Sequence, residues 1–377
     1  MQCHHFDAHR CRSCSLLGTA YAAQLADKVT SAGAVLEAVV PASAWRDPFA
    51  SREESFRNKA KMVVGGTPGE VTLGILDAHR RGVDLRDCGL HEEPLRAALP
   101  VIGELVDELR LLPYDVVKAR GELKHVHATV SPAGELMVRF VLRSQRQADR
   151  LRESIPLLRQ ALPGLRVATI NYLPTHTALL EGDEEEVLTP DRTLPMGLGR
   201  VTLELGPRSF FQTNSAVAAG LYEQVRDWLA ADRPESLLDL YCGVGGFALY
   251  AATLPDPPAV VGVETSVEAV MSARQSLAAL RSDGTALGDV RFDAADATNA
   301  LADTEAIVVN PPRRGIGDQL CRAIEAGPAR TLVYSSCNPE TLATDLARLP
   351  SFGVQQARLF DMFPQTGHSE VLVLATR

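Results

Sequence analysis

The sequence predicts an α/β protein, with a doubly wound sheet in its C-terminal half and a smaller α+β region before it. From about residue 200, short apolar runs alternate with stretches of helical spacing. The apolar runs are residues 237–240, 260–263, 307–309, 332–334 and 371–375. This alternation is typical of a mostly parallel sheet with helices on both faces. Ahead of it, two alternating strands, a helix and a third strand predict the smaller α+β fold.

The earlier elements follow in chain order. Residues 1–14 are rich in cysteine and histidine and predict a metal-binding knuckle. Residues 15–36 have the apolar spacing of a helix, and residues 55–90 alternate like strands around a Gly-Gly-Thr-Pro-Gly turn. The remaining predicted elements are a helix at 92–112, strands at 126–130, 136–142 and 167–172, and a helix at 144–162.

An acidic run with proline and glycine at 181–199 predicts a linker or exposed loop. We therefore divide the chain into three parts. Residues 1–90 form the cysteine knuckle and the β region, residues 91–190 the small α+β domain, and residues 191–377 the doubly wound domain.

The composition is that of an ordinary globular protein, since 46% of the 377 residues are hydrophobic and 23% are charged. No apolar run approaches the roughly 20 residues of a membrane span, and the polar N-terminus lacks a signal-peptide core. We therefore expect a cytoplasmic protein. The net charge is −9, but residues 118–166 hold ten Lys/Arg and four Asp/Glu. This segment could bind phosphate groups, or it could be a solvated arginine-rich helix.

A glycine-rich turn follows the first strand of the C-terminal region, within residues 236–247. Glycines let the backbone approach a ligand closely, and Asp239 before them suits a cationic ligand group. Glu264 ends the next strand, where a carboxylate can accept hydrogen bonds from both ribose hydroxyls. Asp296 could contact an adenine amino group, whereas Cys242 is expected to be a small packing residue. This series resembles the S-adenosylmethionine (SAM)-dependent methyltransferases.

Three landmarks near the last strands carry the candidate chemistry. Cys337 lies in the segment Ser-Ser-Cys-Asn-Pro that directly follows the apolar run 332–334, so its thiol is expected at the C-terminal end of a strand, where open α/β sheets bind ligands. Residues 310–315 read Asn-Pro-Pro-Arg-Arg-Gly, and Glu370 precedes the last strand. In similar enzymes that methylate amino groups, an aromatic residue follows Asn-Pro-Pro. Here Arg313 follows, which argues against N-methylation.

A thiol and a carboxylate suit covalent chemistry on a pyrimidine. C5 of uracil is a poor nucleophile, but a thiolate that adds to C6 converts the ring into an enolate that can accept a methyl group. A general base must then remove the C5 proton so that the enzyme can leave. Cys337 fits the first role and Glu370 the second. Taken alone, each has a plainer interpretation, as a buried inert cysteine and as a surface carboxylate.

Five segments together resemble the RNA uracil-C5 methyltransferase family. They are residues 210–214, 239–247, 310–315, 336–339 and 364–370. The resemblance spans the chain, is densest over 200–377, and implies a Rossmann-like SAM methyltransferase domain that acts on C5 of a uridine. The chain departs from the family pattern at Asn310, where relatives often carry Asp, and at 366–369, which read Thr-Gly-His-Ser.

The same resemblance implies roles for individual residues. Those expected to contact SAM are Gln212, Tyr241, Glu264 and Asn310. Cys337 would be the nucleophile, and Glu370 would be the base that abstracts the C5 proton.

Four cysteines are candidate ligands of a metal centre, namely Cys3, Cys11, Cys14 and Cys88. Four thiolates suit zinc and an iron–sulfur cluster alike, and the nearby His4, His5 or His9 could join a zinc site. Family members that act on ribosomal RNA carry a [4Fe-4S] cluster on cysteines of matching spacing. The resemblance therefore implies a [4Fe-4S] cluster with a structural role, and 23S ribosomal RNA as the partner. Because the knuckle begins at residue 3, no RNA-binding barrel is expected before it.

The target uridine has to leave its stack to reach Cys337, so a flipped base or a looped RNA is expected. The candidates for contacts with the RNA backbone are Phe56, Arg57, Lys59, Lys61 and the arginines of 139–159. An ordinary exposed strand would show the same pattern. Arg313 and Arg314 could hold the phosphate of the flipped nucleotide. The family also implies a monomer, and the lack of a long apolar run predicts no association with membranes.

Two functions of other kinds fit parts of the sequence. An N-methyltransferase would use Asn-Pro-Pro on an adenine or a glutamine and would not need Cys337. An iron–sulfur RNA-binding protein with an inactive methyltransferase domain would not bind SAM. Within the family, transfer RNA or a second ribosomal site are alternative targets, and the sequence does not identify the uridine.

Overall fold

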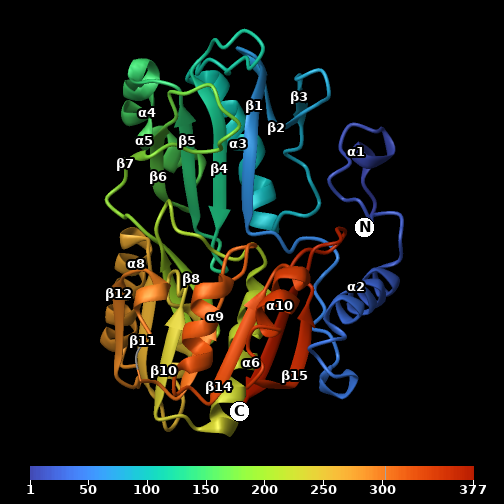
Figure 1. Ribbon diagram of the computed structural model, residues 1–377. Helices are drawn as coiled ribbons and strands as arrows, with labels where there is room; N and C mark the ends of the chain where they lie inside the picture. The colour runs from blue at the N-terminus through green and yellow to red at the C-terminus, as the bar shows by residue number, and fades with distance from the viewer. Residues whose placement is uncertain (302) are drawn as a thin grey trace. The chain divides into compact units, whose positions relative to one another are not determined.

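The computed structural model describes residues 1–301 and 303–377, and the chain forms two compact units (Figure 1). Unit 1 contains residues 1–17 and 53–196, and unit 2 contains residues 18–52 and 197–377. Each unit is therefore built from two separate pieces of the chain.

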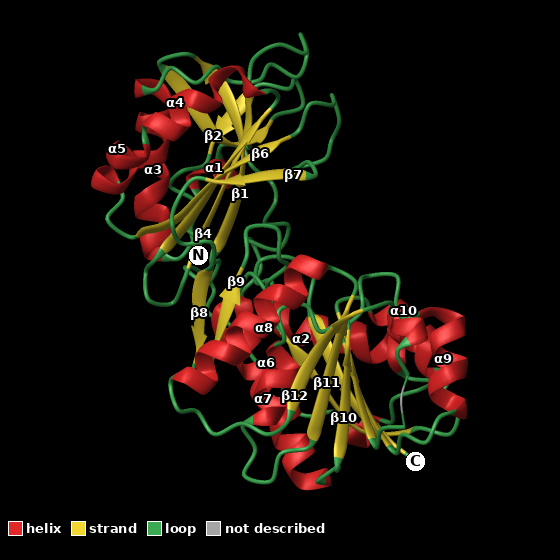
Figure 2. Cartoon of the chain, turned by 90° about the vertical axis from the view of Figure 1, so that its left-hand side faces the viewer, coloured by secondary structure: helices red, strands yellow, loops and turns green. Residues whose placement is uncertain are grey.

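Unit 1 is a seven-stranded sheet with helices packed on one face (Figure 2). The strand order is β3-β2-β1-β4-β5-β6-β7, antiparallel except between β5 and β6. The strands are β1 (Lys59–Thr67), β2 (Glu70–Leu76), β3 (Gly82–Asp84), β4 (Leu123–Val130), β5 (Leu136–Leu142), β6 (Leu165–Tyr172) and β7 (Glu184–Val187). The helices are α1 (His4–Asp7), α3 (Glu93–Glu108), α4 (Ala148–Glu153) and α5 (Ile155–Ala161), with a short η2 (Gln145–Gln147).

The strand pairing in unit 1 crosses the boundary that the sequence analysis places at residue 90. β1 pairs with β4 over five positions, so that Val63 lies opposite His125. Met62 and Val126 consequently belong to the same apolar core, together with the buried face of α3. Residues 53–90 and 91–190 are thus parts of one folded unit, because neither half of the sheet would bury its apolar face alone.

Two further differences from the sequence-based elements have local causes. The segment 181–199, predicted as a linker, contains the whole of two strands, β7 and β8. Its glutamates form a strand because Arg139 and Arg152 on neighbouring elements neutralise them. The helix predicted at 144–162 is divided at Ser154, since Pro156 has no N–H to continue the helical hydrogen bonds.

Unit 2 contains a second seven-stranded sheet, in the order β12-β11-β10-β13-β14-β16-β15. The strands are β10 (Ser236–Leu240), β11 (Ala259–Glu264), β12 (Val290–Ala294), β13 (Ala306–Val309), β14 (Thr331–Ser336), β15 (Gly353–Phe360) and β16 (Glu370–Thr376). The first five in spatial order are parallel, and β16 is antiparallel to both neighbours. β8 (Leu194–Leu198) and β9 (Val201–Leu205) form a separate two-stranded sheet. The predicted doubly wound α/β fold is confirmed.

Helices cover both faces of the sheet in unit 2. α9 and α10 lie on one face, and α6, α7 and α8 lie on the other (Figure 2). The helices are α2 (Tyr21–Leu36), α6 (Ser215–Asp232), α7 (Gly246–Ala252), α8 (Val267–Ser282), α9 (Gly317–Ala326) and α10 (Pro339–Leu346), with short turns η1 (Ala42–Ala44) and η3 (Ala297–Asn299). Among the described residues, no helix is both long and apolar enough to cross a bilayer.

The chain order of the strands reverses beside β10, with β11 and β12 on one side and β13 and β14 on the other. In open parallel sheets, ligands bind outside the carboxyl ends of the strands at such a reversal. This edge of the sheet carries the glycine turn after β10, Glu264 at the end of β11, and Cys337 after β14. The fold therefore gathers the predicted site residues along one edge.

Residues 18–52 complete unit 2, although they precede most of unit 1 in the sequence. α2 begins at Tyr21 rather than at residue 15, and it packs against α10. Beyond α2, the N–H groups of Arg46 and Phe49 donate to carbonyls of β15 at 2.8 and 2.7 Å. This segment covers the free edge of β15, a strand that the sequence analysis does not predict, and so prevents that edge from pairing with other chains.

Candidate functional site

The turn after β10 opens a space beside the sheet. Tyr241 and Gly243 have positive φ angles of 60° and 54°, which bend the chain sharply toward α7. A side chain at Gly243 would meet no atom within 4 Å, so there is room for a ligand against the backbone. Asp239 is fully buried, and burial raises its pKa to about 8. One of its carboxylate oxygens accepts the N–H of Ala248 at 3.0 Å, and the other has no partner among the described residues.

Glu264 ends β11 and is tied to the same turn. Its carboxylate accepts the N–H of Gly243 at 3.3 Å and the N–H of Ser266 at 2.9 Å. These hydrogen bonds fix the orientation of the carboxylate, which stays partly exposed to solvent. The residues present therefore fit SAM, because an open glycine turn and a carboxylate on the adjacent strand end can receive a nucleoside with its ribose.

Three of the predicted SAM contacts stand at the ends of adjacent strands. Tyr241 follows β10, Glu264 ends β11, and Asn310 follows β13. The N–H of Asn310 donates to the carbonyl of Leu240 at 3.4 Å, which holds the start of the Pro-Pro turn beside β10. Gln212, the fourth, is buried in the segment between β9 and α6.

Cys337 lies in the step from β14 to α10 and is half-buried. The hydroxyl of Ser336 accepts the N–H of Asn338 at 3.1 Å, and the side chain of Asn338 caps the first turn of α10. The strand therefore ends, and the helix begins, around the thiol. Burial and the neighbouring Glu370 raise the pKa of Cys337, whereas the charge and the hydrogen bond of Arg313 lower it.

Glu370 is the first residue of β16 and is only 3% exposed. Burial raises the pKa of Glu370 to about 7, although a hydrogen bond from the Ser335 hydroxyl at 2.7 Å acts in the opposite direction. β14 and β16 are paired up to Ser336 and Val371, so the thiol and the carboxylate come from neighbouring strand ends. The structure thus brings Cys337 and Glu370 together, with a carboxyl group that titrates near neutral pH, as a general base requires.

The Pro-Pro-Arg-Arg turn is fixed against α10. The carbonyl of Arg313 accepts the side-chain amide of Asn338 at 3.2 Å. Gly315 has φ 77°, and a Cβ there would come within 2.2 Å of the Asp345 carboxylate, so only glycine fits. This packing directs the guanidinium of Arg313 to the thiol of Cys337.

Sequence reasoning missed two partners of the reactive groups. The contact of Arg313 with an RNA phosphate stays a prediction, and the structure adds a hydrogen bond from Arg313 that lowers the pKa of Cys337. Sequence reasoning gives Ser335 no role, but this residue donates to Glu370. The signal for Ser335 is a serine pair that ends an otherwise apolar strand, Thr331–Ser336. Nothing in the sequence indicates that Arg313 contacts Cys337, because the two residues come together only in the folded chain.

The four candidate ligand cysteines all lie in unit 1 and are not joined by disulfides. Burial, together with the charges of Cys88, Cys11 and Cys3, raises the pKa of Cys14 to about 12. The four thiols therefore gather around one point. Arg57, which is also largely buried there, acts on this pKa in the opposite direction.

Histidines connect the knuckle to the loop that carries Cys88. His5 Nε2 lies 2.6 Å from the carboxylate of Asp87. His4, His5 and Asp87 are the one group of three metal-binding side chains, among the described residues, whose ligand atoms all lie within 4.8 Å of one another. No three of the cysteine sulfurs belong to a group of this kind among the described residues.

Several residues proposed to contact RNA are buried. Phe56 belongs to the interior, and the guanidinium of Arg57 donates to the carbonyl of Lys59 at 3.0 Å beside the cysteines. Arg139 is 3% exposed on the open face of the sheet in unit 1, where glutamates neutralise it. Lys61 remains exposed. Arg57 and Arg139 thus serve the fold, and their assignment to RNA contacts is corrected here.

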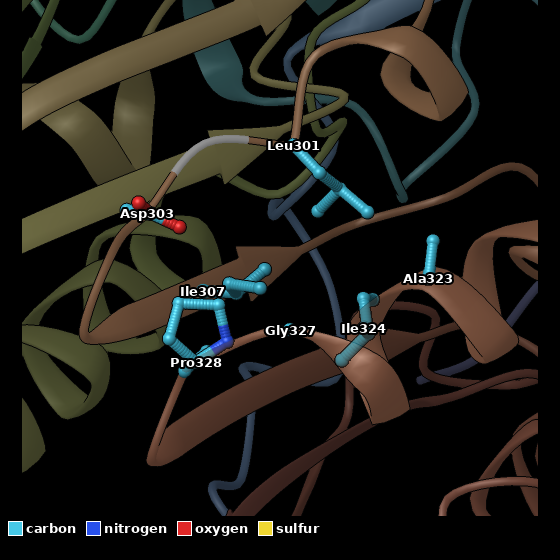
Figure 3. A pocket seen from close by; sticks show the side chains of 8 residues that line it. Leu301, Asp303, Ile307, Ala323, Ile324, Gly327 and Pro328 are labelled. Atoms are coloured by element: carbon cyan, nitrogen blue, oxygen red, sulfur yellow. The ribbon is translucent and has the colours of Figure 1, made fainter.

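A cavity of about 180 Å³ lies at the other end of β13, away from these groups (Figure 3). It is lined by Leu301, Asp303, Ile307, Ala323, Ile324, Gly327, Pro328 and Ala329. Ile307 lies near the start of β13, whereas Asn310 follows its end. With one charged side chain in its wall, the cavity has no part in the site described above.

The strand order and the polar groups at one edge of the sheet place the chain in the class of SAM-dependent methyltransferases. The sequence pattern of one family, described as tRNA (Uracil-5-)-methyltransferase, matches residues 20–377. The chain belongs to this family.

Curated relatives match the whole chain. A protein of Halothiobacillus neapolitanus is 42% identical over 385 positions and covers 100% of both chains. A protein of Escherichia coli (strain K12 / MC4100 / BW2952) is 42% identical over 384 positions with the same coverage. Both are named 23S rRNA (uracil(747)-C(5))-methyltransferase RlmC.

A solved structure has the same fold. It is the Pyrococcus abyssi tRNA (uracil-54, C5)-methyltransferase in complex with S-adenosyl-L-homocysteine. The TM-score is 0.81, the sequence identity is 24%, and the match covers 96% of this chain and 85% of that one. The likeness therefore includes both seven-stranded sheets and not the methyltransferase unit alone.

Proposed function

We propose that this protein transfers a methyl group from SAM to C5 of a uridine in 23S ribosomal RNA, through a covalent bond between Cys337 and C6. The observation that carries this proposal is a half-buried thiol beside a buried carboxyl group, whose pKa is about 7, on adjacent strand ends. Family membership supports the reaction class. The full-length relatives are named for uracil 747, which is the uridine we propose.

Cys337 acts first, as the thiolate. It adds to C6 of the uracil, and the electrons of the C5–C6 double bond move onto C5 and O4 as an enolate. Arg313 supports this step, because its hydrogen bond and its charge favour the thiolate against the effect of burial. SAM supplies the methyl group as an electrophile. C5 takes that methyl, and S-adenosylhomocysteine leaves with the electron pair of the broken bond.

Glu370 completes the reaction. Its carboxylate takes the proton from C5, the electrons of that C–H bond restore the C5–C6 double bond, and the thiolate of Cys337 leaves C6. A carboxyl group with a pKa near 7 is a stronger base than an ordinary glutamate and is still partly ionised at neutral pH. The hydroxyl of Ser335 keeps the carboxylate oriented during these steps.

The residues proposed to hold SAM are Gln212, Tyr241, Glu264 and Asn310. Glu264 is supported by its place at the end of β11, beside the open glycine turn. Asn310 can accept a hydrogen bond through its amide oxygen, as a carboxylate would. Both reactive groups come from one chain, so we propose that a monomer is sufficient.

The ligands proposed for a [4Fe-4S] cluster are Cys3, Cys11, Cys14 and Cys88. The charges of the other three thiols and of the partly buried Arg57 all act on Cys14, and a cation beside four thiolates supports an anionic group at this place. A bound cluster would join residues 1–17 to the loop before α3 and so stabilise unit 1. Iron, sulfide and zinc analysis of protein purified without oxygen tests this part of the proposal.

Methyl transfer from labelled SAM to unmodified 23S RNA tests the reaction. We expect label in 5-methyluridine, lost in Cys337→Ala and kept in Cys321→Ala, which changes a buried cysteine of α9. Label in another nucleoside, or a fully active Cys337→Ala, would favour an N-methyltransferase. A failure to bind SAM would favour an RNA-binding protein with an inactive methyltransferase unit.

A further inference from the structure

The proposed chemistry does not explain a buried polar stripe on α2. Gln24, Lys28, Ala32 and Leu36 are the buried residues of this helix. They follow at intervals of four residues, so they lie along one side of it. Ala32 and Leu36 join the apolar core of unit 2. A buried lysine and a buried glutamine are costly without hydrogen-bond partners, so their partners indicate what the first half of the helix does.

The partner of Lys28 lies in the loop that leads to Glu370. This loop, residues 361–369, joins β15 to β16. Lys28 Nζ donates to the carboxylate of Asp361 at 2.6 Å and to the carbonyl of Phe363 at 3.0 Å. The side chains of Lys28 and Asp361 are 3% and 0% exposed. The ion pair therefore fixes the start of the loop inside the protein, where solvent screens it little.

Gln24 holds the middle of the same loop through a pair of amide hydrogen bonds. Its Nε2 donates to the side-chain oxygen of Gln365 at 2.9 Å, and its Oε1 accepts the backbone N–H of Gln365 at 3.0 Å. Gln365 has φ 67°, a left-handed conformation that is strained for a residue other than glycine. The helix thus holds the loop in a bend five residues before Glu370 that the loop would not keep unaided.

The second half of α2 contacts the other side of the active site. α2 packs against α10, the helix that begins just after Cys337. Ala32 and Leu36 share a core with Leu342 and Leu346 of that helix. One helix therefore touches both the element that follows the nucleophile and the loop that precedes the base.

We propose that α2 is a brace that sets the position of Glu370 relative to Cys337, with Gln24 and Lys28 as positioning residues. This inference rests on the proposed function, because it assigns the brace to the step in which Glu370 takes the C5 proton. A general base must lie within hydrogen-bond reach of the proton it removes. Thiolate addition and methyl transfer precede that step and do not use the base. A loosened brace therefore slows the last step and spares the earlier ones.

Gln24→Met tests the brace, since methionine has a similar size and makes neither amide hydrogen bond. The matched control is Gln147→Met in unit 1. Gln147 is also buried, accepts the N–H of Leu112 at 2.9 Å and donates to the carbonyl of Arg110 at 3.2 Å. A second variant, Lys28→Met with Asp361→Leu, removes the ion pair without leaving a buried charge unpaired. Thermal unfolding of all variants identifies any that fail to fold.

Two RNA substrates separate the steps, one with uridine and one with 5-fluorouridine at the target. Fluorine at C5 cannot be removed as a proton, so the reaction stops at the methylated covalent adduct. Formation of this adduct reports only the steps before the base acts. We expect Gln24→Met to form the adduct at the wild-type rate but to form 5-methyluridine about tenfold more slowly. A displacement of 1 Å can lower a reaction rate by roughly a hundredfold, and we expect a smaller displacement of Glu370 here. Covalent enzyme–RNA complex should accumulate on the ordinary substrate, and Gln147→Met should match the wild type on both.

An equal fall in adduct and 5-methyluridine formation would overturn the brace, as would unchanged 5-methyluridine formation in folded Gln24→Met and in the Lys28–Asp361 double variant. A wild-type protein that forms neither product would instead overturn the proposed function, and the brace with it. The wild-type reactions therefore distinguish the two failures.

Discussion

The two seven-stranded sheets place their polar groups in opposite ways. In unit 2, β14 and β16 are buried along almost their whole length, and the groups proposed to react, Cys337 and Glu370, stand at their ends. In unit 1, polar groups stand in the middle of one sheet face. Lys61, His127, Arg139 and Thr169 are direct neighbours across four adjacent strands.

The difference decides which groups can react. Glu370 at its strand end has a pKa of about 7 and can gain or lose a proton at neutral pH. On the sheet face of unit 1, burial and nearby cations lower the pKa of His127 to about 2, so it stays neutral. Arg139 is held by Glu181 and Glu185. Polar groups within this sheet are structural, whereas those at the ends of the other sheet are available for chemistry.

The largest effect is expected from Glu370→Gln, which keeps the shape of the side chain but removes the base. Loss of a general base lowers turnover by roughly a hundredfold to ten-thousandfold. Quench-flow assays of 5-methyluridine, with gels that detect covalent RNA complexes, should show slow release from an adduct that still forms. Turnover at the wild-type rate would mean that another group takes the proton.

Cys88→Ser should have the next largest effect, confined to unit 1. It removes the proposed ligand that lies in the loop before α3, and a metal group bound there would contribute directly to folding free energy. We expect most of the iron to be lost and the unfolding transition of unit 1 to move to lower temperature. Cys321→Ala should keep the iron. An unchanged iron content in Cys88→Ser would exclude this residue as a ligand.

Arg139→Met tests whether the sheet-face cation is structural. The substitution leaves Glu181 and Glu185 without their cation. We expect the free energy of unfolding to fall by about 3 kcal/mol. This value is at the lower end of the range for breaking buried ion pairs, because Glu181 is partly exposed. Urea unfolding measures this, with Arg152→Met, which breaks exposed ion pairs, as a nearly silent control. If RNA affinity fell instead and stability did not, Arg139 would be an RNA contact after all.

Ser335→Ala should have the smallest effect and should show it as a change in pH dependence. Loss of the hydroxyl removes a hydrogen bond that lowers the pKa of Glu370, so the carboxyl group ionises at higher pH. The rising limb of the activity profile should move upward. The loss at pH 6.5 should stay within about tenfold, because a one-unit shift changes the ionised fraction by no more than that. Ser336→Ala, whose hydroxyl contacts Asn338, should leave the profile unchanged.

Much of unit 2 could be predicted from the sequence, because its strands and turns have patterns that are visible in short stretches of residues. Buried parallel strands are apolar runs, as Ala306–Val309 shows, and the glycine turn follows such a run directly. β7 could not be predicted in this way. Its sequence, Glu-Glu-Glu-Val, resembles a solvated loop, and it becomes a strand through cations that lie elsewhere in the chain.

The site residues also fall into those that the local sequence predicts and those that depend on distant parts of the chain. Cys337 and Glu370 follow from their places beside apolar strands. The bond of Arg313 to the thiol and that of Ser335 to the carboxylate depend on strands and turns that meet only in the fold. Gln24 and Lys28 appear in the sequence as ordinary exposed positions of a helix, since nothing near them marks their partners.

The ion pair between Lys28 and Asp361 spans 333 positions of the chain. At roughly 5 to 20 residues per second, a ribosome needs about 20 to 70 seconds to pass from one partner to the other. Residues 53–196, with a core of their own, emerge during that interval. Unit 1 can therefore fold before the partners of α2 have been made. The sheet of unit 2 is complete only when the loop at 361–369 and the strand β16 after it have been made. By the proposed mechanism, a nascent chain cannot release 5-methyluridine until then, because the residue that would take the C5 proton is among the last to be made.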